Sequence, residues 1–451
     1  MEKKILWAAW LLPVFFAASV AAQSGVEAKA LEGLSPVTTL AKSEAGRAAL
    51  GANFTMTGGI QRGEIQQPLL LPFAMQQQQA LRDVSVTSGN LVQLADGFGS
   101  TLGAAYEVRA HYSDRTHFSV ISKKFAELSG YAMATSGSDS EHAKFFFANL
   151  TVDGTTPVPA ESKAILDKIG GTTDPFGRAY ELPAGAPGGD RFGDARPFQT
   201  EPAVARIVGP DYFHTPADNI GYNHGPFMNL TNSPSYPSGH TTYAYTASLM
   251  LALMVPERYQ QMMTRAAEYG NDRILVGAHY AMDVMGGRTL ALYDMAHLLA
   301  NDPAYMNRTV RHATPTSNFR ADLEVARSEV RATLEQVCGK SLAVCAQDDI
   351  GRFSDAAADA AFYAATLTYN LPVVHEQTAQ GREDVGKLAP EAGHLLTAAF
   401  PWLSLEQADA ILTETEGPGG GFLDDGSAFG VYSRLNLYAA AGRALEVAPK
   451  K

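Results

Sequence analysis

The chain has 451 residues, and 46% of them are hydrophobic, so it is long enough to form one large or two medium globular domains with a substantial core. Its formal net charge at pH 7 is −12, which argues against a nucleic-acid partner. A protein this acidic can bind an anion only where its positive charge is concentrated locally.

Residues 1–22 have the pattern of a secretory signal peptide. Lys3 and Lys4 form a basic start, residues 5–20 are mostly apolar, and Ala21-Ala22 offers small residues for cleavage. The apolar run is short for a membrane span, although an uncleaved anchor is the alternative reading. The longest other apolar run covers only 247–255. We therefore expect a periplasmic or secreted protein with no integral membrane span after cleavage.

The first half of the chain alternates between irregular and helical patterns. Residues 23 to about 60 are small and polar without a clear period, which favours an extended arm. Apolar residues recur at helical spacing around 67–84, 90–112 and 115–134. The glycine-rich stretch 170–200 predicts a long ordered loop that leads to Arg196. Long loops in compact domains are often functional, so we expect this one to cover part of a functional site near Arg196.

The second half reads as a series of helices. One is expected from His240 to Val255, a second from Pro256, and a third from His279 to about Ala300. Residues 320–340 and 355–366 also have helical patterns. We therefore predict an all-α protein, a helical bundle with long loops whose polar residues sit at helix starts, where the helix dipole favours an anion.

Cys338 and Cys345 are the two cysteines of the chain. In an oxidising compartment they are expected to form a local disulfide, with buried free thiols as the alternative. Closing so short a loop contributes about 2–3 kcal/mol to stability. Cysteine and histidine residues nowhere have zinc-site spacing, so no metal site is expected.

The strongest chemical signal lies at His279 and Asp283. Four residues apart on a helix, they share one face, so the carboxylate can orient the imidazole. Arg273, six residues before His279, carries a permanent charge that can bind two oxygens of a phosphate. These three residues are the parts of a site that transfers an oxyanion.

A second group of anion-binding candidates lies upstream. The Ser238 hydroxyl and the Gly239 amide are donors suited to an oxyanion, and His240 follows them directly. Arg196, before Pro197, adds a second guanidinium. Together with Arg273 these residues could hold a tetrahedral oxyanion.

These residues resemble the three-part signature of the type 2 phosphatidic acid phosphatase superfamily, which includes bacterial class A acid phosphatases and vanadium haloperoxidases. The signature reads K-x6-R-P, then P-S-G-H, then S-R-x5-H-x3-D. The second block matches at 237–240, and the third matches at Arg273, His279 and Asp283. The surrounding residues are most similar to the class A acid phosphatases, over a region from about 190 to 290.

Two positions depart from the signature. Its lysine is expected at 189, where the chain has Gly189, and Arg191 is the nearest cation that could supply the charge. The serine before Arg273 is replaced by Asp272. Since an acid facing the site would oppose anion binding, we expect Asp272 to point outward.

The resemblance implies a secreted acid phosphatase that hydrolyses small phosphate esters without a metal or other cofactor. In that scheme His279 is the nucleophile, Asp283 fixes its tautomer, and His240 is the general acid. The phosphate would be bound by Arg196, Ser238, Gly239, Arg273 and Arg191. The expected organisation is a helical region at 23–160, the catalytic core at 161–310, and a helical extension at 311–451 packed on that core.

Two alternatives use the same residues. A vanadium haloperoxidase would hold vanadate as its cofactor, because vanadate resembles the phosphoryl transition state; the missing lysine argues somewhat against it. A secreted protein that binds an anion without turnover is the other alternative, and the presence of His240, His279 and Asp283 argues against it.

Overall fold

The computed structural model describes residues 28–64, 69–84, 91–113, 117–171, 191–200, 207, 230–348 and 351–449. The named elements in these ranges are all helices, and β pairing within them is limited to isolated bridges such as the one between Thr151 and Pro157. The expected all-α class is therefore confirmed. The proposed signal peptide and most of the expected loop at 170–200 lie outside the described residues.

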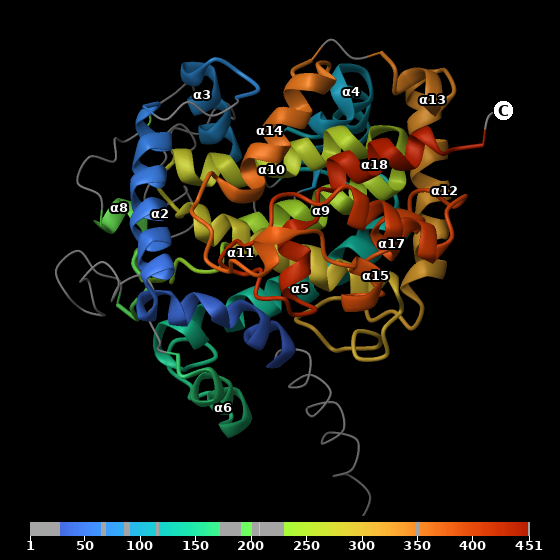
Figure 1. The fold of residues 1–451 in the computed structure, drawn as a ribbon. Coiled ribbons are helices and arrows are strands. Elements are labelled where there is room, and N and C mark those ends of the chain that lie inside the picture. Colours follow the sequence, from blue (N-terminus) through green and yellow to red (C-terminus); the bar gives the residue numbers. More distant parts are fainter. Residues whose placement is uncertain are drawn as a thin grey trace, which may run out of the picture.

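The helices follow one another along the chain from blue to red in Figure 1 and are named below in three stretches of sequence. The first stretch contains η1 (Ser35–Lys42), α2 (Glu44–Arg62), α3 (Phe73–Asp83), η2 (Val92–Phe98), α4 (Gly99–Arg109), α5 (Lys123–Asn149), α6 (Ala160–Ile169) and α8 (Pro197–Thr200). The second contains η4 (Leu230–Asn232), α9 (Gly239–Met254), η5 (Pro256–Arg258), α10 (Tyr259–Leu275) and α11 (Ala281–Leu299). The third contains α12 (Phe319–Cys338), α13 (Leu342–Cys345), α14 (Ala356–Thr368), η6 (Thr378–Gln380), α15 (Val385–Leu388), α16 (His394–Thr397), α17 (Leu405–Glu414), η7 (Gly430–Arg434) and α18 (Leu437–Glu446).

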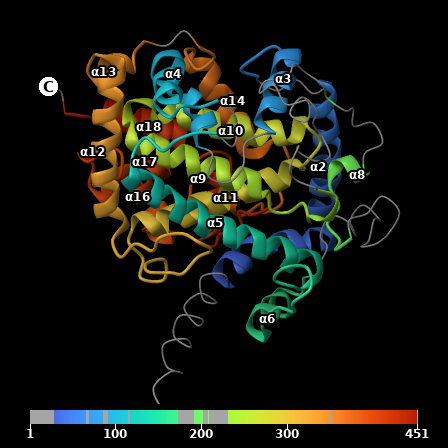
Figure 2. The same ribbon diagram turned by 180° about the vertical axis from the view of Figure 1, so that it is seen from behind.

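Helices α9, α10 and α11 occupy the centre of the molecule in both views (Figures 1 and 2). The sequences of α9 and α11 are largely apolar on every side, which is the composition of a helix that is covered all round. Their side chains are accordingly almost all buried. The motif residues lie at the ends of these three helices, so the core itself fixes their relative positions.

The expected extended arm at residues 23–60 is wrong, because most of it forms η1 and α2. Helix α2 buries apolar residues such as Leu50 and Ile60, but small and polar residues share its buried side and interrupt the apolar stripe. There Asn53 Oδ1 accepts a hydrogen bond from Met282 N (3.0 Å), and Thr57 Oγ1 accepts one from Ala281 N (3.1 Å). These contacts satisfy free N–H groups at the start of α11, so α2 is held by capping as well as by apolar burial.

The C-terminal third packs against the central helices through buried polar contacts. Arg288 of α11 donates hydrogen bonds to the carbonyl oxygens of Thr366 (3.0 Å), Leu367 (3.2 Å) and Ser433 (2.7 Å). The hydroxyl of Tyr259 donates to Leu395 O at 3.0 Å. These side chains replace water at backbone groups that would otherwise be buried without partners.

Helix α12 matches the helix expected at 320–340, and its buried residues recur at helical spacing. The expected disulfide is present: Cys338, at the end of α12, is bonded to Cys345 of α13. Within the described part of the chain, none of the helices combines the length and the hydropathy needed to cross a bilayer.

Candidate active site

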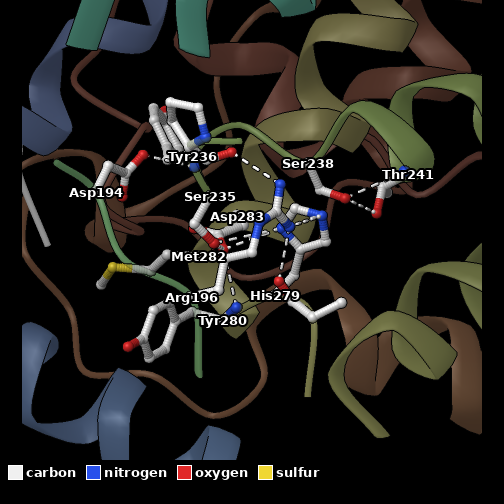
Figure 3. Close-up of polar contacts among 12 residues, drawn as sticks. Asp194, Arg196, Ser235, Tyr236, Ser238, Thr241, His279, Tyr280, Met282 and Asp283 are labelled. Atoms are coloured by element: carbon white, nitrogen blue, oxygen red, sulfur yellow. Dashed lines mark hydrogen bonds and ion pairs between the residues drawn. The ribbon is translucent and has the colours of Figure 1, made fainter. Parts of the chain in front are cut away.

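The three motif blocks meet at one place in the fold (Figure 3). Arg196 precedes α8, residues 235–238 precede α9, and Arg273 lies in the last turn of α10. His279 follows in the connection between α10 and α11, and Asp283 lies in the first turn of α11. The structure thus brings together residues that are up to 87 positions apart in the sequence.

Ser238 is the N-cap of α9. Its Oγ accepts hydrogen bonds from Thr241 N (3.2 Å) and Thr241 Oγ1 (2.8 Å), and its own amide donates to the carbonyl oxygen of Asp283 at 3.0 Å. Gly239 and His240 are the first two residues of the helix. Their position at a helix N-terminus is one where backbone N–H groups and the helix dipole favour a bound anion.

His279 is held by a carboxylate on one side and a guanidinium on the other. Its Nδ1 lies 3.2 Å from Asp283 Oδ2, an atom that also accepts hydrogen bonds from Tyr280 N (2.9 Å) and the Ser235 hydroxyl. Its Nε2 lies 3.0 Å from Arg196 Nη1, which can only donate. This network assigns the proton to Nδ1 and leaves the lone pair on Nε2, the form required of a nucleophile.

Arg196 is buried, and its guanidinium joins the blocks through further hydrogen bonds. Nε donates to Ser233 O (2.7 Å), Nη1 to Ala278 O (2.8 Å), and Nη2 to Pro234 O (3.0 Å) and Ser233 Oγ (3.1 Å). With His279 Nε2, these contacts use the five donors of the side chain. Arg196 therefore both orients His279 and holds the loop before α9, and an anion must exchange with one of these partners to bind it.

Arg273 is buried, and its Nε and Nη1 have no hydrogen-bond partner among the described residues. Burial lowers its pKa, although a guanidinium remains charged at every relevant pH. A buried charge without hydrogen-bond partners is costly unless an opposite charge binds beside it. Arg273 is therefore the member of the group best prepared to bind an incoming oxyanion.

The site shifts the pKa values of its titratable groups. Burial, reinforced by the surrounding positive charges, holds the pKa values of His240 and His279 well below their usual range. Burial raises the pKa of Asp283 to about 6, against the lowering effect of its hydrogen bonds from Ser235 and Tyr280. Both imidazoles are thus neutral under mildly acidic conditions, and the environment resists adding a proton to either.

The residues that depart from the signature are placed differently from the expectation. Arg191 is exposed, and its guanidinium lies over the ring of Phe192, 5.2 Å from the centroid. Asp272 was expected to point outward, but it is fully buried and accepts a hydrogen bond from Gln76 Nε2 of α3 at 2.9 Å. Burial and the nearby carboxylates of Asp83 and Glu268 raise its pKa well above the usual range, which favours the neutral acid over the carboxylate.

Two further residues at the site were not found from the sequence. Asp194 holds the loop before α9, because its Oδ2 accepts from Tyr236 N (2.7 Å) and its carbonyl oxygen accepts from Ser235 N (3.0 Å). Lys144 reaches the same loop from α5 and donates from Nζ to Pro234 O at 2.8 Å. Asp194 lies two residues before Arg196, which is a weak signal, whereas Lys144 has no sequence signal at all.

Comparison with known proteins agrees with this geometry. Residues 188–300 match the PAP2 superfamily. The chain is 33% identical to an acid phosphatase of Zymomonas mobilis subsp. mobilis over 101 residues, which cover 22% of this chain and 33% of that protein. It is 41% identical to a non-specific acid phosphatase of Salmonella typhi over 69 residues, which cover 15% of this chain and 28% of that protein.

A third relative carries a different name. The chain is 35% identical over 87 residues to a lipid A 1-phosphatase of Rhizobium johnstonii, covering 19% of this chain and 34% of that protein. The chain thus spans about a third of the length of the curated relatives it matches. The region 188–300 that matches the superfamily contains Arg196, Arg273, His279 and Asp283.

Proposed function

We propose that the protein is a phosphatase that hydrolyses phosphate monoesters through a phosphohistidine intermediate, a proposal supported by the match of residues 188–300 to the PAP2 superfamily. The observation that carries the proposal is the state of His279. Its Nδ1 faces Asp283 and its Nε2 faces Arg196, which keeps the lone pair on Nε2 among positive charges. Such a nitrogen is oriented to attack the phosphorus of an anion bound by those charges.

In the first chemical step, His279 Nε2 forms a bond to phosphorus and the bond from phosphorus to the ester oxygen breaks. His240 donates a proton to the departing alkoxide. Asp283 stabilises the proton that remains on Nδ1 of the phosphorylated ring. In the second step, water gives its proton to His240 and attacks phosphorus, the phosphorus–nitrogen bond breaks, and inorganic phosphate leaves.

Charge on the non-bridging phosphate oxygens would be stabilised by Arg273, Arg196, the Ser238 hydroxyl and the Gly239 amide. The substrate itself prepares His240 for its role. A bound phosphate dianion offsets the neighbouring guanidinium charges that lower the pKa of His240, so this imidazole becomes easier to protonate when substrate is present.

We also propose a cellular location and a domain organisation for the enzyme. The signal-peptide pattern of residues 1–22 and the disulfide between Cys338 and Cys345 fit a periplasmic or secreted enzyme acting on small phosphate esters. We also propose that residues 161–310 form the catalytic core and that 311–451 form an extension supporting it. The hydrogen bonds from Arg288 to the C-terminal third support that arrangement.

The test is phosphate release from p-nitrophenyl phosphate between pH 4 and 8 in the presence of a chelator. We expect activity that persists with the chelator and is highest at acidic pH. Rapid quenching in alkali should trap an acid-labile phosphoryl label, and peptide mass spectrometry should locate it on His279. Complete loss of activity on chelation with recovery on adding a divalent metal, or a label on another residue, would contradict the proposal.

A further inference from the structure

A lysine from outside the motif region lies against the candidate site. Lys144, near the end of α5, is 8% exposed, and its Nζ donates hydrogen bonds to Pro234 O (2.8 Å) and Ser235 O (3.2 Å). Its aliphatic part lies beside the first residue of α9, because a Cβ at Gly239 would be 3.4 Å from Lys144 Cε. The ammonium group is thus fixed beside the loop that precedes the anion-binding end of α9.

The ammonium of Lys144 and the guanidinium of Arg196 converge on one atom. Pro234 O accepts from Lys144 Nζ at 2.8 Å and from Arg196 Nη2 at 3.0 Å. Two like charges drawn together in a buried place repel each other, so their proximity is unfavourable unless an anion binds between or beside them. The arrangement is therefore one that a bound oxyanion would stabilise.

The charge of Lys144 also reaches each titratable group of the site. It contributes to the lowered pKa values of His240 and His279, and it opposes the rise in the pKa of Asp283. Electrostatic interactions in proteins weaken over about 10 Å at moderate ionic strength. Together with its hydrogen bonds to the loop before α9, this places Lys144 within electrostatic reach of the residues of the proposed mechanism.

We propose that Lys144 is the third cation of the anion site and takes the place of the lysine expected at position 189. This inference deepens the proposed phosphatase function and rests on it. Lys144 lies outside the region 188–300 that matches the PAP2 superfamily, so the lysine and arginine that the signature separates by six residues are here separated by residues 145–195.

The described residues between Lys144 and Arg196 leave α5 and come back to it. Helix α5 ends at Asn149, the left-handed residue Leu150 follows, and the chain continues into α6, which projects from the body of the molecule (Figures 1 and 2). It returns at Phe192, whose ring contacts Phe145 edge to face with 5.5 Å between centroids. Because the excursion returns to the residue that follows Lys144, it can lengthen the sequence between lysine and arginine without moving them apart in space.

The rival candidate for this charge is Arg191, which lies nearer the expected position in sequence. Its side chain is exposed and its guanidinium rests over Phe192. An exposed cation is screened by water and salt, so it contributes far less to binding an anion than a buried one. The two residues therefore make opposite predictions in a direct comparison.

The experiment compares Lys144→Met, Lys144→Arg and Arg191→Met with the parent protein. Lys123→Met is the matched control, because it removes an exposed charge from the first turn of the same helix. Calorimetry measures the Kd values of inorganic phosphate and vanadate, and the pH dependence of kcat/KM for p-nitrophenyl phosphate is followed in parallel. Circular dichroism verifies the helical content of each variant.

We expect Lys144→Met to weaken phosphate and vanadate binding by about 30-fold or more, as when one partner of a buried charge contact is lost. Lys144→Arg should recover much of the affinity, and Arg191→Met and Lys123→Met should stay within about threefold of the parent, as for exposed charges. Removing the ammonium should also raise the pKa of His279, so the acidic limb of kcat/KM should move to higher pH. A purely structural role for Lys144 would not move that limb.

The possible outcomes separate the role of Lys144 from the proposed phosphatase function. Unchanged affinity and an unchanged acidic limb in Lys144→Met would overturn the inference and leave the phosphatase function standing. A parent that binds phosphate without hydrolysing esters would overturn the function, and the affinities of the variants would still test the role of Lys144. If Lys144→Met does not fold, Lys144→Gln and Lys144→Arg replace it: affinity lost in the first and kept in the second supports the inference, and equal affinities overturn it.

Discussion

At the scale of single residues, the site sets its chemistry by keeping positive charge next to neutral imidazoles. His279 can attack phosphorus only while Nε2 is unprotonated, and burial among cations lowers its pKa. The nucleophile therefore remains available at pH values where an exposed histidine would be protonated. This favours the acidic optimum proposed for the enzyme.

The proposed acid role of His240 predicts a dependence on the leaving group. In His240→Ala, esters with basic leaving groups should lose roughly 10²- to 10⁴-fold in kcat/KM, because their alkoxides need a proton as they depart. p-Nitrophenyl phosphate should lose much less. The measurement is kcat/KM across a series of aryl and alkyl phosphates, with His279→Asn as the inactive reference. Equal losses across the series would rule out His240 as the general acid.

Arg273 predicts a loss of oxyanion affinity. Vanadate should inhibit the parent competitively, and its inhibition constant should rise in Arg273→Ala by an amount equivalent to about 2–5 kcal/mol, since a buried charged contact is removed. Arg191→Ala should change the constant far less, because Arg191 is exposed. Inhibition assays on the two variants provide the comparison. Equal inhibition of parent and Arg273→Ala would show that Arg273 does not contact the oxyanion.

At the scale of elements, the contact between α9 and α11 sets the distance between the anion-binding helix start and Asp283. Two glycines of α11, Gly286 and Gly287, allow the two segments to approach closely. A Cβ at Gly287 would lie 2.4 Å from Ser238 O, and one at Gly286 would lie 2.6 Å from Tyr236 Cε2. Any larger residue at either position must push α11 away from the loop that carries the motif.

Gly287→Ala should therefore damage both stability and activity. We expect a loss of about 1–3 kcal/mol in the free energy of unfolding from overpacking, together with a lower kcat/KM. Gly130→Ala on α5 is the control: a Cβ there meets nothing within 4 Å, and replacing a helical glycine should stabilise by about 0.5–1 kcal/mol. Urea unfolding with parallel kinetics measures both effects. A Gly287→Ala protein as stable and active as the parent would show that the close approach is not required.

At the scale of the whole molecule, the C-terminal third contains a cluster of acidic side chains around Arg434. Arg434 Nη2 lies 2.9 Å from Glu416 Oε2, and its Nη1 lies 3.6 Å from Glu383 Oε2 and 3.7 Å from Asp424 Oδ2. One guanidinium cannot offset three carboxylates. Burial raises the pKa of Glu416 to about 7, and burial with the nearby Asp424 raises that of Glu383 to about 7.

These raised pKa values predict that this cluster favours the folded state in acid. The folded chain holds a proton on Glu416 that the unfolded chain releases above about pH 4.5, so the contribution is complete below that pH and is lost as pH rises through about 7. Glu416→Gln, neutral at every pH, should match the parent near pH 4.5 and have the higher Tm near pH 8. Thermal unfolding across pH measures the difference, with the exposed Glu406→Gln as control. A difference independent of pH would contradict the assignment.

Local patterns determined much of the helical framework and the proposed chemistry. The spacing of His279 and Asp283 on adjacent turns, and the cap formed by Ser238 before α9, depend on contacts within a few residues. The apolar composition of α9 and the stripe of α12 likewise depend on the helical period alone. Features of this kind can be derived from a sequence because covalent geometry fixes them.

The remaining features were decided by tertiary structure. Helix α2 was missed because polar residues interrupt its buried face and cap α11, a partner more than 200 residues away. The pKa of Asp272 is raised by burial and by Asp83 of α3, and neither the burial nor the approach of α3 can be read from the local sequence. Lys144 comes close to Arg196 because Phe192, near Arg196, packs on Phe145, the residue that follows Lys144. Side chains meet through packing across the fold, and no spacing along the chain records which distant segments the core will bring together.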